Sequence, residues 1–249
     1  MTTETLIIPP SYSPLSPKES LPTMYDLPSE EIGDSGLPDE FHLLQLQILQ
    51  NSFKSPKYYP NHQFSAIDMN LYYDETNTLW YKRPDWFGVV GVSRFYEESD
   101  LRLSYVIWQE QISPFIVVEL LSPGTENEDL GLKKAKAGKP PTKWQVYEEI
   151  LKVPYYVVFS RYTNEMQAFH LEGNRYQKVE LTNNRLMIPS IELSLGLWHG
   201  NYDQIERLWL RWMTLEGDLI PLPTEEAEIA NKRAENAEKR AENAEKRAE

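Results

Sequence analysis

Two acidic residues stand in apolar surroundings, where a carboxylate is costly. Glu119 interrupts the apolar run 115–121, and Asp85 follows Pro84 at the start of a second apolar stretch, 85–92. An unpaired buried carboxylate is unfavourable, so such side chains should be ion-paired, protonated or bound to a metal. Two carboxylates that converge from neighbouring strands would suit a hard divalent cation such as Mg²⁺ or Mn²⁺.

A basic side chain near these acids would complete a hydrolytic site. Lys143 opens the helix predicted after the run 115–121 and is the best-placed candidate. A metal ion can neutralise a phosphate and activate water, and an ammonium group can stabilise negative charge in the transition state. The lysines between 133 and 139 would contact phosphates without reading a base sequence, or only add solubility.

Each of these residues also has a plainer interpretation. Glu119 could lie at a strand end and reach solvent or a structural lysine. Asp85 could belong to an ordinary Pro-Asp turn, and Lys143 could be a solvated residue at a helix start. Only their convergence at one place would make them a site.

The composition restricts the class of protein. The chain has 249 residues, with seven Trp, fifteen Tyr, four His and no Cys. This length allows one sizeable core with extensions, and the absence of cysteine excludes thiolate metal sites and fits a cytoplasmic location. The histidines show no i,i+4 pairing, so we expect carboxylates to hold any metal. No apolar run is long enough for a membrane span, and we expect no signal peptide.

The net charge of −13 argues at first sight against a nucleic acid partner. The charge is spread unevenly, however: residues 1–40 carry −7, residues 224–249 carry −2, and the middle of the chain, 41–223, carries −4. A mildly negative charge is compatible with a nuclease, because the metal-binding carboxylates contribute to it and the bound cation offsets them.

The periodicity of apolar residues predicts the elements that must position these side chains. It indicates helices over 41–53, 143–151 and 205–213, strands over 64–73, 85–92, 115–121 and 155–160, and a hairpin of 166–171 with 175–181. This order predicts an α/β fold with a mixed central sheet flanked by helices. The segment 115–159 should form a parallel strand pair with a right-handed crossover.

Three regions differ in character. Residues 1–40 are rich in Pro and Ser and predict an extended arm, residues 41–223 predict the folded domain, and residues 224–249 repeat every seven residues. The alanines of this tail are spaced three and four apart, which marks a coiled-coil seam, and Thr224 is its expected N-cap. Alanine offers little apolar area, so we expect a single solvated helix or a weak coiled-coil association.

Several segments together resemble a known family. They are Arg83-Pro-Asp-Trp, the run Pro114-Phe-Ile-Val-Val-Glu-Leu-Leu-Ser-Pro-Gly-Thr, Asp129, Lys143 with Tyr147, and Val153-Pro-Tyr-Tyr-Val-Val-Phe. Over about residues 60–215 the chain is similar to the Uma-type restriction endonuclease family, a branch of the PD-(D/E)xK nuclease superfamily. The resemblance implies a restriction-endonuclease-like fold, a divalent metal and DNA as substrate.

The resemblance also implies roles for individual residues. Asp85 matches the aspartate of the PD motif and Glu119 the acidic member of (D/E)xK. Together with the Leu120 carbonyl they would bind Mg²⁺ or Mn²⁺. The superfamily lysine should lie two residues after Glu119, where this chain has Leu121. In this branch a lysine from the following helix takes its place, which points to Lys143.

A further acid, Asp129, matches one in the connecting loop of the family. Two functions remain open: a metal-dependent DNA endonuclease, and a catalytically silent DNA-binding or scaffold protein of the same fold with a coiled-coil tail. Leu121 favours the second, and the pair Asp85 and Glu119 favours the first. We expect DNA as the partner, no membrane association, and a homodimer as one assembly open to the chain.

Overall fold

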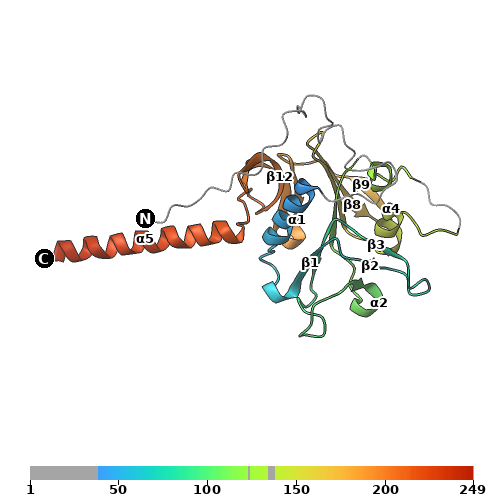
Figure 1. The fold of residues 1–249 in the computed structure, drawn as a ribbon, viewed down its shortest axis with the longest axis horizontal. Coiled ribbons are helices and arrows are strands. Elements are labelled where there is room, and N and C mark those ends of the chain that lie inside the picture. The colour runs from blue at the N-terminus through green and yellow to red at the C-terminus, as the bar shows by residue number, and fades with distance from the viewer. Residues whose placement is uncertain (1–38, 123, 134–137, 249) are drawn as a thin grey trace, which may run out of the picture.

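A six-stranded mixed sheet forms the centre of the molecule (Figure 1). The computed structural model describes residues 39–122, 124–133 and 138–248. The strand order is β1-β4-β6-β7-β8-β9. The bounds are β1 Gln63–Ile67, β4 Trp86–Val90, β6 Ile116–Leu120, β7 Tyr155–Ser160, β8 Glu165–Glu172 and β9 Arg175–Lys178. Within this six-stranded sheet, β6 and β7 are the one parallel pair, and the other neighbouring strands are antiparallel. The predicted mixed α/β architecture and its parallel pair are therefore confirmed.

One face of this sheet packs against a helix and a second sheet. The helix is α1 Glu40–Ser52, and the second sheet has the order β10-β11-β12, with β10 Arg185–Ile188, β11 Leu193–Tyr202 and β12 Ile205–Met213. Aromatic rings join the layers: Phe53 lies 5.3 Å from Trp86 and 5.1 Å from Trp212 between ring centroids. Buried rings of this size account for much of the stability of such a core.

The other face carries the smaller elements. Helix α4 Lys143–Gln145 continues directly into the π-helix η2 Val146–Ile150, and beside it lies a small sheet of the order β3-β2-β5. The remaining bounds are β2 Leu71–Tyr72, β3 Tyr81–Lys82, β5 Tyr105–Val106, α2 Ile107–Glu110, α3 Glu126–Asp129, η1 Pro60–His62 and η3 Pro189–Ile191. The second core cluster, which includes Phe87, Val117 and Tyr147, fills this side.

Strand β6 shows how the fold selects the face for Glu119. Ile116, Val118 and Leu120 belong to the core under α1, whereas Val117 belongs to the core under α4. Alternate residues of a strand point to opposite faces. Glu119 therefore points to the side where α4 and the π-helix lie.

The prediction of a helix over 205–213 is wrong, because this segment is strand β12, paired with β11 in antiparallel register. Aromatic and branched side chains fit a pleated surface, and every residue from 209 to 213 is buried, so this half of the segment has no solvated helical face. The preceding turn is formed by Asp203 and Gln204, both with positive φ. It contains no glycine or asparagine, the residues that usually mark such a hairpin turn.

Two other expected elements differ in extent. The strand predicted over 64–73 is divided into β1 and β2, which lie in different sheets, and Asp68 between them has a φ of +48°. The helix predicted over 143–151 begins as an α-helix, with a Thr142–Gln145 capping box, and then widens into the π-helix. The hairpin of β8 and β9 across Gly173 is confirmed.

The tail is the helix α5 Pro223–Ala248, which projects away from the folded body (Figure 1). It begins one residue before Thr224, and Glu225 Oε2 accepts the Leu222 amide at 2.7 Å, so the expected Thr224 N-cap is wrong. Association through its alanine seam stays a prediction. Among the described residues, no helix combines the length and apolarity needed to cross a membrane. Most of the predicted arm, residues 1–38, lies outside the described residues, and Glu40 already belongs to α1.

Candidate metal centre

Glu119 is completely buried, and both of its carboxylate oxygens accept hydrogen bonds. The Tyr147 hydroxyl donates to its Oε1 at 2.9 Å. The Lys143 ammonium donates to Oε2 at 2.9 Å, and the Asp85 amide reaches the same oxygen at 3.3 Å. Both oxygens therefore have partners on the α4 side of the sheet, which is how a carboxylate tolerates burial.

Asp85 lies at the same end of the sheet because β4 runs antiparallel to β6. The residue before β4 thus meets the end of β6. The Leu120 amide donates to Asp85 Oδ2 at 2.6 Å, while the Asp85 amide donates to Glu119. The structure brings Asp85, Glu119 and the Leu120 backbone together; their role as metal ligands stays a prediction.

Lys143 reaches this cluster from the next helix. Its Nζ lies 2.9 Å from Glu119 Oε2 and 3.0 Å from Asp129 Oδ1. The Thr142 side chain accepts the Gln145 amide and so fixes the start of the helix that carries Lys143. An ammonium group is therefore present although position 121 is leucine, and Leu121 packs against the second core cluster.

Asp129, at the end of α3, is 1% exposed. The Tyr156 hydroxyl holds its backbone carbonyl at 2.9 Å. Its Oδ1 is close to Lys143 but accepts no well-directed hydrogen bond from the described residues. Its ion pair with Lys143 makes Asp129 part of the cluster.

Burial and charge set the protonation of this cluster. Burial raises the pKa of Glu119 well above its usual range and also raises the pKa of Asp85, and the Lys143 ammonium only partly opposes both effects. Burial alone would lower the pKa of Lys143, but Glu119, Asp129 and Asp85 raise it well above its usual range. Lys143 therefore stays protonated at neutral pH, and the carboxylates need more positive charge than it supplies.

Two residues beside Asp85 were missed by the sequence reasoning. His42 in the first turn of α1 and Asp68 after β1 each place a ligand atom near Asp85, and the three atoms lie within 4.8 Å of one another. His42 Nε2 is 3.5 Å from Asp68 Oδ2. Their sequence signal is weak, because His42 lies on an ordinary amphipathic helix and Asp68 inside a run that predicts one continuous strand.

The oxygen-rich donor set fits the divalent cation that this arrangement implies. Asp85, Asp68 and the Leu120 carbonyl are hard ligands of the kind that Mg²⁺ and Mn²⁺ prefer, and the carboxylates of the cluster exceed its cations.

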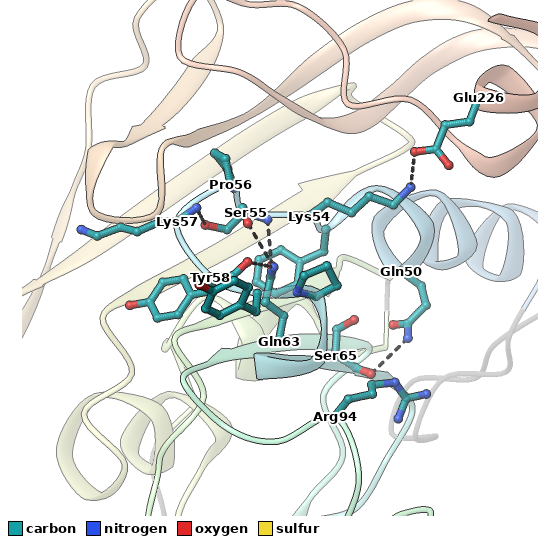
Figure 2. Close-up of a pocket in the computed structure, with 13 residues that line it drawn as sticks. Gln50, Lys54, Ser55, Pro56, Lys57, Tyr58, Gln63, Ser65, Arg94 and Glu226 are labelled. Atoms are coloured by element: carbon teal, nitrogen blue, oxygen red, sulfur yellow. Dashed lines mark hydrogen bonds and ion pairs between the residues drawn. The ribbon is translucent and has the colours of Figure 1, made fainter. Parts of the chain in front are cut away.

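A pocket of about 890 Å³ lies away from these acids, at the opposite end of β1 (Figure 2). Its lining includes the cations Lys54, Lys57 and Arg94 and the ring of Tyr58. Lys54 is paired with Glu226 of α5 at 2.7 Å. None of the residues predicted for the site lines this pocket.

Comparison with protein families decides the affiliation. A family model, Uma2, described as "Putative restriction endonuclease", matches residues 19–205. The chain belongs to the Uma2 family. The resemblance seen in the sequence is therefore confirmed, and the match covers every element that carries the acid cluster. A comparison with curated proteins gives no match.

Proposed function

We propose that this Uma2 protein is a metal-dependent endonuclease that hydrolyses phosphodiester bonds in DNA. One observation carries the proposal: the Lys143 ammonium lies 2.9 Å from Glu119 and 3.0 Å from Asp129, beside Asp85. The cluster thus has two acids from neighbouring strands and one cation from the following helix, although position 121 is leucine. The family match supports a nuclease of the restriction endonuclease class.

The proposed site assigns each residue a task. Asp85, Glu119 and the Leu120 carbonyl would hold Mg²⁺ or Mn²⁺, which would neutralise the phosphate and lower the pKa of a bound water. Lys143 would orient the attacking water and stabilise the charge that develops on the phosphate. Because its pKa is raised, it acts as a fixed positive charge and not as a base. Tyr147 is a positioning residue that holds the Glu119 carboxylate.

The test is metal-dependent nicking of supercoiled plasmid DNA by the full chain. Asp85→Asn and Glu119→Gln keep the shape of each side chain and remove its charge. Each should lower the cleavage rate by at least about 100-fold, the scale of losing one preorganised electrostatic contact. Asp203→Asn is the control, because Asp203 is exposed in the β11–β12 turn and asparagine tolerates its positive φ. Unchanged cleavage by Glu119→Gln would refute the proposed site.

The alternative is a catalytically silent DNA-binding or scaffold protein, which Leu121 favours. The same experiment separates the two functions. A silent protein would bind DNA or recruit partner proteins, and it would leave the plasmid intact in the presence of either Mg²⁺ or Mn²⁺. The Asp85→Asn variant of a silent protein would bind DNA as the parent does. In a working nuclease the same change should lower the cleavage rate.

A further inference from the structure

The side of Asp85 that faces away from Glu119 carries a second set of metal-binding groups. His42 of α1, Asp68 after β1 and Asp85 before β4 each offer one ligand atom, all within 4.8 Å of one another. The three residues come from three elements and are each partly buried. An imidazole nitrogen and two carboxylate oxygens that are this close could converge on one divalent ion after small side-chain adjustments.

The backbone holds these three side chains in place. Asp39 caps α1 by accepting the His42 amide at 2.8 Å, and Arg161 pairs with Asp39 at 2.7 Å. The Asp68 amide donates to the Asp85 carbonyl at 3.1 Å. The helix start and both strand ends are therefore fixed relative to one another, and little ordering would remain when an ion binds.

The hydrogen bonds of the acids leave this side of Asp85 available. The Leu120 amide occupies Asp85 Oδ2, whereas Oδ1 accepts no hydrogen bond from the described residues. Both oxygens of Glu119, in contrast, are bonded to Tyr147 and Lys143. A metal ion can therefore reach Asp85 from the His42 side without displacing any of these partners.

The charge around Asp85 also requires a cation. Four carboxyl groups lie around this point, those of Asp68, Asp85, Glu119 and Asp129. Among the described residues, Lys143 pairs with Glu119 and Asp129, and His42 pairs with Asp68. The carboxyl groups here therefore outnumber the cationic side chains in contact with them. Partly buried anions without counter-charge are strongly unfavourable, and a divalent ion would balance them.

We propose that His42 and Asp68 act with Asp85 as a mixed nitrogen and oxygen site for a divalent transition-metal ion, and that this chain binds Mn²⁺ in preference to Mg²⁺. This inference deepens the proposed function, because Asp85 would belong to both ligand sets. The reason for the preference is chemical: Mg²⁺ takes oxygen ligands and keeps its waters, whereas imidazole suits first-row transition metals.

The test measures binding directly, without DNA. Mn²⁺ and Mg²⁺ are titrated calorimetrically into the metal-free full chain, and the electron paramagnetic resonance of bound Mn²⁺ is examined for coupling to an imidazole nitrogen. We expect Mn²⁺ to bind at least about tenfold tighter than Mg²⁺, with nitrogen coupling present. His42→Ala should remove the coupling and at least about tenfold of the Mn²⁺ affinity, and leave Mg²⁺ affinity within about twofold.

His199→Ala is the matched control. Its imidazole also lies near a carboxylate, 3.8 Å from Glu206, but no second carboxylate of the described residues joins this exposed pair to form a metal-binding group. It should leave Mn²⁺ binding and the nitrogen coupling unchanged. Asp68→Asn tests the second new ligand, with Mn²⁺ affinity expected to fall as in His42→Ala. Thermal melting in the presence of a chelator establishes that each variant is folded.

The outcomes separate this inference from the proposed function. If His42→Ala binds Mn²⁺ as tightly as the parent, or the parent shows no nitrogen coupling, the new site is refuted, whatever the protein does to DNA. If Mn²⁺ binds through His42 and the chain leaves all DNA intact, the site stands and the nuclease function alone fails.

Discussion

At the scale of single residues, the proposed role of Lys143 can be tested by placing a lysine at position 121, where the superfamily has it. Residues 119 and 121 point to the same face of a strand, because alternate side chains do. The variant Lys143→Met should lose at least about 100-fold of plasmid nicking. In the double variant Leu121→Lys/Lys143→Met, an ammonium group would again lie near Glu119, and we expect at least about a tenth of the parent rate to return.

The control for this exchange is Lys139→Met, a change of the same type at an exposed lysine. It should cut as the parent does. If the double variant is as inactive as Lys143→Met and melts at the same temperature as the parent, the ammonium group must come from position 143. Full activity of Lys143→Met would remove the lysine from the mechanism altogether.

Tyr147 offers a second test at this scale, on stability. Its hydroxyl donates to the Glu119 carboxylate, whereas the hydroxyl of Tyr176, which is also buried, donates to the neutral Val153 carbonyl, both at 2.9 Å. Hydrogen bonds to charged groups contribute about 1.5–3 kcal/mol and neutral ones about 0.5–1.5 kcal/mol. In urea unfolding at neutral pH, Tyr147→Phe should therefore lose more stability than Tyr176→Phe. Equal losses would indicate that Glu119 is uncharged in the folded protein.

How much of the site could be predicted follows from where its residues lie in the chain. Glu119 and Asp85 could be found because a carboxylate inside an apolar run is visible in the sequence. Lys143 could be found because it opens the next helix. His42 and Asp68 could not, since each stands in an unremarkable local pattern and becomes relevant only when α1 and β1 meet the start of β4. Tyr147 was part of the family resemblance, but its bond to Glu119 could not be predicted from the sequence.

At the scale of elements, the errors have a common physical cause. In segment 205–213 the second half, 209–213, is buried on both faces of strand β12, and a run without a solvated side carries no clear period. The π-helix 146–150 widens the turn that follows Lys143, and sequence patterns based on 3.6 residues per turn do not detect one. The central strands β4, β6 and β7 were predictable because they are short apolar runs with clear ends.

The junction between β12 and the tail carries a prediction on pH. The Arg211 side chain is 0% exposed, and its Nη2 lies 2.8 Å from Glu225 Oε2. Burial opposes ionisation of Glu225, but the bonds from Arg211 and from the Leu222 amide outweigh it and lower its pKa. A lowered folded-state pKa adds stability above the usual value of 4.5, and this stability is lost as the pH falls through the folded-state value.

We therefore expect Glu225→Gln to be less stable than the parent by about 1–3 kcal/mol at pH 7, because Arg211 loses a charged partner. The difference should shrink as the pH is lowered below 4.5. Chemical unfolding at several pH values measures it. Glu228→Gln, three residues further along the exposed helix, is the control and should show no such trend. A difference that is independent of pH would contradict the assigned ion pair.

At the scale of the whole molecule, the helix α5 carries a prediction on the oligomeric state of the chain. This helix extends about 39 Å and is solvent-exposed from Glu228 through Asn243. An alanine seam buries little apolar area on pairing, so sedimentation should find the full chain monomeric at micromolar concentration. Ala234→Leu/Ala237→Leu/Ala241→Leu enlarges the seam and should produce a stable dimer or trimer, whereas leucines at Asn236 and Lys239, off the seam, should not. A parent dimer that survives replacement of the seam alanines by glutamate would place the interface elsewhere.

The path of DNA over the molecule is the second question at this scale. The pocket extends along β1 to its far end, where Gln63 lies about 16 Å from Asp68, the rise of five strand residues. It combines Lys57 and Arg94 with the ring of Tyr58 (Figure 2), and neither cation forms an ion pair with a described residue. On a chain of net charge −13, such a concentration of cations is a candidate phosphate contact.

The double variant Lys57→Glu/Arg94→Glu should therefore bind a short DNA duplex at least about tenfold more weakly, and its affinity should depend on salt with a slope smaller by about two, because two phosphate contacts are lost. Fluorescence anisotropy at several salt concentrations measures both quantities. Lys178→Glu/Lys239→Glu changes the net charge equally, at the opposite edge of the sheet and in the tail. Long-range repulsion would weaken DNA binding by both variants alike. A larger loss of affinity in Lys57→Glu/Arg94→Glu would therefore place DNA over β1. Equal losses of affinity would show that the pocket takes no part in binding DNA.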